Sequence, residues 1–531
     1  MTSESLRLRG RAAAPGLVAG PLARLAKAVA EGASFESPAA GCAALQQAIA
    51  TACRELSRLA ASHPSDATAI LEFQLALLED EDLSRPAIAE IENGAPAARA
   101  WERAVEAHIS GYLSSQDDYF RSRSADLVDL RDRVSRSLAG AGESASQLPE
   151  DAILVADDLA PSRFLEIDWS RSGGVALTAG SATSHVAMLA RARGVPMVVG
   201  LGDIPACDGA LALLDGEHGE IEIAPSAERL AEWRERAAAL AERRADEARR
   251  IGAPAVTRSG RRIRALINIQ SLDDLTEEAA HADGVGLVRT EFLFEPGAAL
   301  PDEEAQIEVY RRILDWAGDR PVVIRTLDAG GDKPIAGVTF DGEANPFLGV
   351  RGLRLSLRRP NLFRTQLRAL ARAGMSGNLK AMLPMVTTPD ELGEARAHLD
   401  AAMAELRSEG LAARRPPLGI MVEVPAAALA IDRFDADFYS IGSNDLVQYV
   451  TACDRGSGEL ALLADPLNPA VLQLIGRTIA HARASGASVS LCGDMAGDPR
   501  CIPALLDRGL EEFSVAPPAL GRLKAAVARH E

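Results

Sequence analysis

No stretch of the sequence reaches the roughly 20 consecutive apolar residues that a membrane-spanning helix needs. The start, Met1 to Arg11, is polar and basic and lacks the apolar centre of a secretory signal. We therefore expect a cytoplasmic protein without membrane insertion.

Cysteine is scarce, with six in 531 residues and none of them in a CxxC pair. This usage excludes a disulfide scaffold and a zinc ribbon, so most of the thiols are expected to be buried. Positive charge is in deficit too, because 75 acidic residues against 57 basic ones leave a net charge of −18. The deficit argues against nucleic acid or an anionic membrane as the principal partner and favours a small basic protein.

The length and the apolar content predict several domains. At about 100 to 200 residues per domain, 531 residues make three or four units, and a hydrophobic fraction of 47% can fill their cores. From Ala39 to about Leu138, apolar residues recur with helical spacing. Three prolines, Pro64, Pro86 and Pro96, are expected to divide this segment into several packed helices.

Shorter apolar runs separated by glycines follow between Asp151 and Ile223, which predicts a small α/β domain. The next segment, Ser226 to Arg250, is rich in Ala, Glu and Arg and has few large apolar residues. It is expected to form a mostly solvated helix that links two moving bodies. A helix packed on one domain is the alternative.

Strand-like runs alternate with helical stretches after Ile251. The eight runs are residues 263–269, 284–288, 321–326, 380–385, 418–424, 437–441, 488–492 and 512–515. Their number and spacing predict a (β/α)8 barrel, with an open doubly wound sheet as the alternative. The ends of the runs carry polar residues, namely Asn268, Arg289, Glu291, Arg325, Glu423, Asn444, Asp445, Cys492 and Ser514. A barrel would gather all these ends at one mouth.

A glycine loop, a Thr/Ser cap and a short helix are expected around His185, in the segment from Gly180 to Arg191. In the first turn of a helix, the helix dipole disfavours a protonated imidazole and favours an anionic group bound to it. His185 can therefore accept a phosphoryl group as a nucleophile. By spacing alone, a structural hydrogen-bonding histidine is the commoner outcome at such a place.

This segment, with residues 194–200, resembles the phosphohistidine motif of the Enzyme I family, which starts phosphotransferase relays. One departure is Ser181, where the family has a second glycine. In the preceding loop the family has two threonines where this chain has Ala160 and Phe164, which puts hydroxyl support for the histidine in question. The resemblance implies that His185 is the phosphorylated nucleophile.

Seven ordered motifs in the last half of the chain resemble the phosphoenolpyruvate-binding domain of the same family. They begin at Gly286, Ile324, Asn345, Gly419, Ser440, Asp454 and Cys492. Phosphoenolpyruvate carries a phosphate and a carboxylate on three carbons, so its site needs several fixed cations and planar donors. The resemblance implies a substrate site made of Arg289, Arg325, Lys333, Arg351, Asn444, Asp445 and Arg455.

Within this implied site, Arg289, Arg325 and Lys333 would hold the phosphoryl group, and Asn444 and Arg455 would take the carboxylate. For any one of these arginines alone, a surface ion pair is the commoner role.

Glu423 and Asp445 follow two successive strand runs and are placed to share an octahedral Mg²⁺ that also touches the substrate. In isolation, two such carboxylates are more often a general acid/base pair or solvated charges.

Cys492 corresponds to the proton donor of the family, and a thiol is mostly protonated at neutral pH. Without its motif, an inert buried cysteine is expected there. Asp494 stands where the family has glutamate, a change expected to alter support rather than chemistry.

The resemblance implies an α/β multidomain protein whose barrel follows a swivelling phosphohistidine domain. The expected parts are residues 1–34 with 141–225 for the phosphohistidine α/β domain, 35–140 for an inserted helical subdomain, 226–250 for the linker and 251–531 for the barrel. The implied reaction transfers the phosphoryl group of phosphoenolpyruvate to His185 and then to the histidine-containing phosphocarrier HPr, releasing pyruvate. The family also implies a homodimer formed through the barrel.

The carrier is expected to dock on the helical subdomain, where Leu75, Leu77 and Leu78 precede the acidic residues 79–82. Leucines in a bundle core and a solvated helix end are the alternative.

Two other functions compete with the relay enzyme. A pyruvate phosphate dikinase or phosphoenolpyruvate synthase would need a nucleotide-binding domain, for which the chain has no room, and a regulatory scaffold would have lost turnover.

Overall fold

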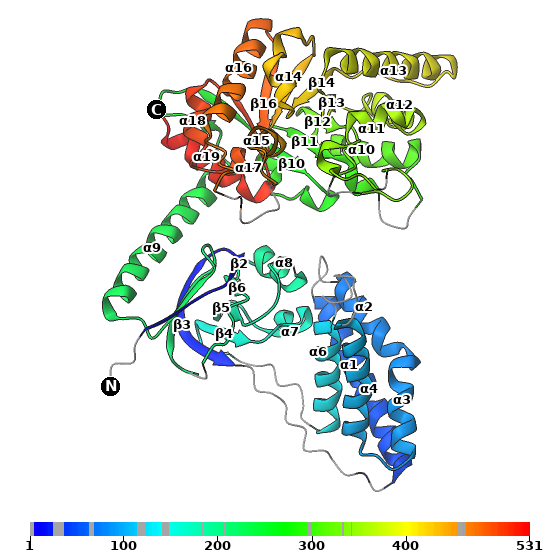
Figure 1. Cartoon of the computed structure of the whole chain (residues 1–531), viewed down its shortest axis with the longest axis vertical. Helices are drawn as coiled ribbons and strands as arrows, with labels where there is room; N and C mark the ends of the chain where they lie inside the picture. The colour runs from blue at the N-terminus through cyan, green and yellow to red at the C-terminus, as the bar shows by residue number, and fades with distance from the viewer. Residues whose placement is uncertain are drawn as a thin grey trace. The chain divides into compact units, whose positions relative to one another are not determined.

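The computed structural model describes residues 5–24, 35, 37–62, 68–113, 124–140, 148–182, 184–205, 208–294, 299–331, 334–340, 342–454, 460 and 462–531. The chain divides into two compact units, Met1–Leu240 and Ala241–Glu531 (Figure 1). Each unit has its own hydrophobic cores.

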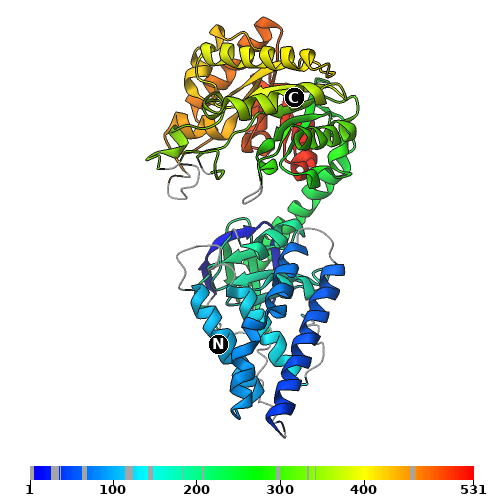
Figure 2. The ribbon, with the colours of Figure 1, turned by 90° about the vertical axis from the view of Figure 1, so that its right-hand side faces the viewer.

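The first unit contains a helical bundle, as the helical spacing predicted. Its described helices are α1 (Pro38–Ser62), α2 (Thr68–Glu79), α3 (Glu81–Glu92), α4 (Ala97–Leu113) and α6 (Ser124–Leu138). These helices lie roughly alongside one another (Figure 2). Their apolar faces bury Leu45, Leu56 and Trp101 completely. The burial of one face of each helix is what stabilises the bundle, because isolated helices of this length are marginal in water.

The prediction that three prolines divide the helical segment was only partly right. Pro96 directly precedes α4, but Pro86 lies inside α3 and does not end it. Pro64 falls outside the described residues. Proline in a helix interior loses one hydrogen bond, but α3 buries Leu83, Ala87 and Ile91 along one face. Tertiary packing of that face outweighs the local cost of the proline.

Beside the bundle, the first unit has a mixed eight-stranded sheet in the order β1-β8-β7-β3-β4-β5-β6-β2. Its strands are β1 (Leu6–Arg9), β2 (Arg11–Ala14), β3 (Leu17–Arg24), β4 (Ala152–Ala156), β5 (Ser172–Leu177), β6 (Met197–Val199), β7 (Leu211–Asp215) and β8 (Glu220–Ile223). The four neighbouring strands from β3 to β6 are parallel. Since β3 and β4 are neighbours in the sheet, the whole bundle is an insertion between two paired strands.

Two short helices cover this sheet, α7 (Pro161–Glu166) and α8 (His185–Ala192). After β8 comes α9 (Ala227–Arg250), in which Trp233 is the only buried residue. The expected solvated helix is therefore present, and the boundary between the two units falls within it.

The second unit is a closed parallel barrel, which excludes the open sheet. Its strands are β10 (Arg262–Ile269), β11 (Val285–Arg289), β12 (Val322–Arg325), β13 (Leu379–Leu383), β14 (Leu418–Val422), β15 (Phe438–Gly442), β16 (Ser488–Cys492) and β17 (Glu512–Val515). Each strand pairs in parallel with the next, and β10 pairs with both β11 and β17, which closes the ring. A two-residue strand β9 (Ala255–Val256) adds to β10.

Helices pack around the barrel, as Figure 1 shows. They are α10 (Glu303–Ala317), α11 (Leu353–Arg358), α12 (Pro360–Ala373), α13 (Pro389–Ser408), α14 (Pro425–Leu429), α15 (Ser443–Thr451), α16 (Pro469–Ser485), α17 (Asp494–Gly497), α18 (Ile502–Asp507) and α19 (Leu520–Arg529). Helix starts are well marked, for example by the side chain of Asp302 at α10 and by a capping box of Thr388 and Glu391 at α13.

The barrel interior is packed rather than hollow. Apolar side chains from successive strands form one buried cluster of Leu287, Val323, Met382, Met421, Phe438 and Cys492. Because all strands are parallel, their carboxyl ends lie at one end of this core, called the mouth below.

Candidate active site

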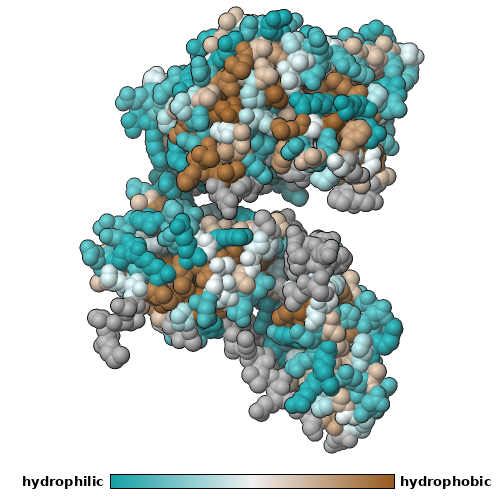
Figure 3. Space-filling model, in the orientation of Figure 1, coloured by the Kyte–Doolittle hydropathy of each residue, from teal (hydrophilic) through white to brown (hydrophobic). Residues whose placement is uncertain are grey.

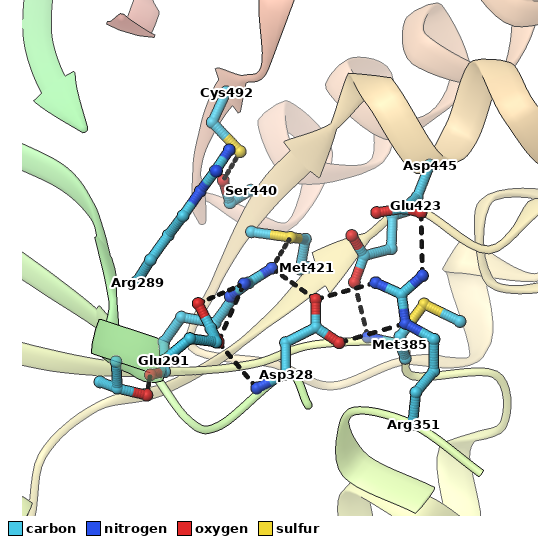
Figure 4. Close-up of polar contacts among 12 residues, drawn as sticks. Arg289, Glu291, Asp328, Arg351, Met385, Met421, Glu423, Ser440, Asp445 and Cys492 are labelled. Carbon is cyan, nitrogen blue, oxygen red and sulfur yellow. Dashed lines mark hydrogen bonds and ion pairs between the residues drawn. The ribbon is translucent and has the colours of Figure 1, made fainter. Parts of the chain in front are cut away.

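The mouth brings together the polar residues that end the barrel strands. Arg289, Arg325 and Cys492 are the last residues of β11, β12 and β16, and Glu423 directly follows β14. Asp445 lies in the first turn of α15, which begins where β15 ends. Figure 4 shows Arg289, Glu423, Asp445 and Cys492 in one region with Glu291, Asp328 and Arg351.

Two buried arginines form the centre of the mouth. Arg325 and Arg351 are 5% and 2% exposed. Arg325 donates to both carboxylate oxygens of Glu291 at 3.1 Å and pairs with Asp328 at 2.9 Å. Arg351 pairs with Asp328 at 2.9 Å and with Asp445 at 3.1 Å. Asp328 therefore bridges two fixed cations, which places planar donors of positive charge in a space from which water is largely excluded.

A second group of contacts fixes Glu423. Its side chain is 1% exposed, and one carboxylate oxygen accepts a hydrogen bond from the backbone N–H of Met385 at 2.6 Å. Met385 has a φ of 57°, a left-handed conformation that is uncommon for a residue with a side chain. Burial, with Asp445 and Asp328 nearby, holds the pKa of Glu423 well above its usual range. A cation that binds beside this carboxylate would therefore stabilise its charged form.

Cys492 is a buried thiol with two sulfur contacts. Its Sγ accepts from the hydroxyl of Ser440 at 3.8 Å and donates to the carbonyl of Ile441 at 3.6 Å. Burial raises the pKa of Cys492 to about 11, although the Ser440 hydrogen bond opposes the shift. The sulfur therefore keeps its proton at neutral pH.

Other mouth residues show how the expected substrate site is held. Arg289 is half-buried, and its guanidinium donates to the side chain of Gln270 at 3.1 Å. Asn444 accepts from the backbone N–H of Asp494 at 2.8 Å and donates to its carboxylate at 3.2 Å. Asp494, the residue that departs from the family pattern, thus supports Asn444. Lys333 and Arg455 lie outside the described residues.

His185 lies in the first unit, at the first position of α8 as expected. The preceding Ser184 caps the helix by accepting from the backbone N–H of Ala187 at 3.3 Å. In the loop before it, Ala160 precedes α7 without a side-chain cap, and Phe164 is fully buried and stacks on Trp169. Apolar packing therefore occupies the positions where the family has threonines.

The sequence pattern missed several residues that organise the mouth. Asp328 lies within a recognised motif, but nothing in its spacing shows that it bridges two arginines. Tyr449 ends a recognised motif, but nothing in that motif shows that its hydroxyl lies 3.3 Å from Arg351 Nη1 and donates to the carbonyl of Phe347 at 2.6 Å. Ser440 lies in the middle of β15, two residues before Gly442, which pairs with Cys492. Only this inward position, one level below Cys492, could have indicated the hydrogen bond from Ser440 to the Cys492 sulfur.

Comparison with known proteins agrees with this geometry. Residues 244–531 match the model of the PEP-utilising enzyme PEP-binding domain, residues 9–123 the PEP-utilising enzyme N-terminal model and residues 148–219 the mobile domain of the same enzymes. The chain belongs to the family of PEP-utilising enzymes. Enzymes of this family use a divalent metal ion.

Its relatives are more specific. The chain is 38% identical to the phosphoenolpyruvate-protein phosphotransferase of Geobacillus stearothermophilus and 37% identical to that of Bacillus sp. (strain S), covering 86% of this chain and 82% of either relative. It is 39% identical to the phosphoenolpyruvate-protein phosphotransferase of Haloferax volcanii, over 87% of this chain and 81% of that protein.

Two features are absent from the described residues. No described helix combines the length and the apolar character needed to span a bilayer. Within the same part of the chain, no group of three or more His, Cys, Asp and Glu side chains is arranged to hold a metal ion.

Proposed function

We propose that this chain is a phosphoenolpyruvate-protein phosphotransferase, which takes the phosphoryl group of phosphoenolpyruvate onto His185, passes it to a histidine of HPr and releases pyruvate. The observation that carries the proposal is the mouth, where two buried arginines lie beside a buried thiol of raised pKa in a barrel of the PEP-binding type. A small anion that carries a phosphate and a carboxylate and must later gain a proton on carbon suits this arrangement.

Substrate binding would use the arginines as they stand. Arg325 and Arg289 would donate to the phosphoryl oxygens, with Lys333, and Asn444 and Arg455 would take the carboxylate. Arg351 and Asp445, already paired at 3.1 Å, would complete the site. Because Arg325 and Arg351 are held by buried carboxylates, little side-chain freedom remains to be lost when substrate binds.

The carboxylates of Glu423 and Asp445 fit the expected Mg²⁺. Both are hard oxygen donors at the end of neighbouring strands, and Glu423 has a raised pKa that a nearby cation would lower again. Two protein ligands suffice for an ion that keeps several waters and binds substrate oxygens. When bound, the ion would neutralise charge on the phosphoryl and enolate oxygens.

The proton that converts the enolate to pyruvate would come from Cys492. When the phosphoryl group leaves, the electron pair of the enolate attacks the S–H proton, a C–H bond forms at the terminal carbon and a thiolate remains. Ser440 donates a hydrogen bond to this sulfur, so its hydroxyl is already placed to stabilise the thiolate.

His185 would act as the nucleophile at the start of α8. The positive end of the helix dipole lies at this position and favours the anionic phosphoryl group once the ring carries it. In-line transfer requires reacting atoms about 3 to 3.5 Å apart. His185 must therefore reach the mouth for loading and a carrier for unloading, and α9 would be the segment that permits both.

The carrier would dock on the bundle, near the turn between α2 and α3. Residues 79–82 are acidic and exposed, and the outer surface of α3 is largely hydrophilic (Figure 3). Leu78 is 3% exposed and belongs to the bundle core, so the prediction that it forms part of the docking surface was wrong. Leu75 and Leu77 are half-buried and remain candidates for contact with a small basic protein.

A direct test incubates the full chain with phosphoenolpyruvate labelled on phosphorus, Mg²⁺ and purified HPr, with and without ATP. We expect acid-labile label on the chain and then on HPr, independent of ATP. No label on either protein would refute the function, and a requirement for ATP would favour a dikinase. Dimerisation through the barrel and a cytoplasmic location remain predictions, and light scattering would measure the first.

A further inference from the structure

A line of buried polar side chains lies behind the mouth, between the barrel wall and its helices. Gln306 and Tyr310 on α10 and Thr290 after β11 are fully buried, and Gln366 on α12 is 3% exposed. The surrounding core is apolar, with Ile307, Ile313, Phe363 and Leu367 among its members. Burying amide and hydroxyl groups here costs free energy unless each finds a hydrogen-bond partner.

Every one of these groups finds a partner, either within the line or on nearby backbone. The Nε2 group of Gln366 donates to Tyr310 and to Thr290, both at 3.2 Å. Tyr310 donates to Oε1 of Gln306 at 3.1 Å, and Gln306 donates to the carbonyl of Pro301 at 3.1 Å. Because both N–H groups of Gln366 are used and its oxygen is used as well, the amide has one satisfied orientation.

The line ends on the backbone that carries the mouth. Oε1 of Gln366 accepts from the backbone N–H of Leu327 at 2.9 Å, and the hydroxyl of Thr290 donates to the carbonyl of Arg325 at 3.0 Å. These two backbone groups flank Thr326, in the turn that leaves β12. The turn holds Arg325 on one side and Asp328 on the other. These two residues pair with each other, and Asp328 also pairs with Arg351.

We propose that Gln366, supported by Tyr310, is a positioning residue that fixes the turn of residues 325–328 so that Arg325 and Asp328 present a preformed anion site. The proposal rests on the function proposed above, because it assigns phosphoenolpyruvate as the anion. Gln366 touches no substrate. Its effect passes through two backbone hydrogen bonds, and a shift of about 1 Å at a reacting site can cost about a hundredfold in rate.

The test compares Gln366→Met, which keeps the side-chain length and removes all three hydrogen bonds, with Tyr310→Phe, which removes one hydroxyl. Thr478→Val is the matched control, because this buried hydroxyl on α16 bonds only within its own helix, to the carbonyl of Leu474 at 3.0 Å. For each full-length variant we would measure phosphoenzyme formation against phosphoenolpyruvate concentration and the urea midpoint. Hydrogen exchange of the Leu327 amide would be followed by mass spectrometry.

We expect Gln366→Met to raise the KM for phosphoenolpyruvate about 10- to 100-fold and to speed hydrogen exchange of the Leu327 amide. Tyr310→Phe should change both quantities by a smaller amount. Thr478→Val should leave the KM and the Leu327 exchange rate at parent values. A variant that loses urea resistance while KM and Leu327 exchange stay at parent values would overturn the proposal and leave a purely structural network. If the parent chain itself forms no phosphoenzyme, the proposed function is wrong. Exchange at Leu327 would still decide whether Gln366 fixes the turn.

Discussion

The thiol of Cys492 gives the sharpest prediction, because its role depends on keeping a proton that an ordinary cysteine would share with solvent. With a pKa raised to about 11 against an ordinary 9.0, about one thiol in a thousand is ionised at pH 8, instead of about one in ten. The shift comes from burial, since the sulfur sits among Leu287, Val323 and Met421 at the top of the barrel core.

The same shift predicts how stability depends on pH. In the unfolded chain the thiol ionises near pH 9, whereas in the folded protein it holds its proton to about pH 11. The contribution of Cys492 is therefore complete below pH 9 and is lost as pH rises through 11, a change of about 3 kcal/mol. Cys492→Ala should remove this part of the decline in unfolding free energy between pH 9 and 11, measured by urea denaturation against the parent.

In the reaction, Cys492→Ala should leave phosphoenzyme formation and substrate affinity largely intact but slow pyruvate release by about 10² to 10⁴. Cys492→Ser should rescue little, because a hydroxyl is a far weaker acid than a thiol. Protonation from solvent would reach either face of the enolate, so isotopically labelled pyruvate should lose its single configuration. Turnover at the parent rate with one-face protonation in Cys492→Ala would refute the assignment and return the thiol to a packing role.

Four further predictions concern the other parts of the relay. His185→Ala should abolish phosphoenzyme and carrier labelling, and acid-labile phosphate on this variant would contradict the assignment. Glu423→Ala or Asp445→Ala should lower Mg²⁺-dependent activity about 10² to 10³ without unfolding the chain, as circular dichroism would check, and near-parent turnover in both would place the metal elsewhere. Asp328→Asn removes the negative charge that two buried guanidinium groups share, which should lower the free energy of unfolding in urea by about 3 to 5 kcal/mol. Added phosphoenolpyruvate should stabilise this variant more than the parent. An unchanged urea midpoint would mean that the bridge is not needed. Deleting residues 35–140 should spare phosphoenzyme formation but block transfer to HPr, and equal transfer rates with and without the segment would exclude the docking role.

The sequence by itself determined the elements and the end of the barrel at which the candidate site lies. Period-2 and period-3.6 patterns arise from local backbone geometry, so all eight barrel strands and the bundle helices lie where the apolar runs indicated. Parallel strands must end at one mouth, so Arg325, Glu423 and Cys492 could be placed together before any contact was known. The placement of His185 at a helix start followed from the adjoining Ser184, a purely local feature.

Only the tertiary structure decided how these groups are paired and how much water reaches them. Asp328 bridges Arg325 and Arg351, and Gln366 reaches the turn beside Arg325 from a helix 39 positions away from Leu327. Such contacts depend on which helix packs against which strand end, and no local pattern encodes that choice. The raised pKa values of Glu423 and Cys492 likewise follow from burial and neighbouring charge, which arise only when the barrel closes and excludes solvent from its interior.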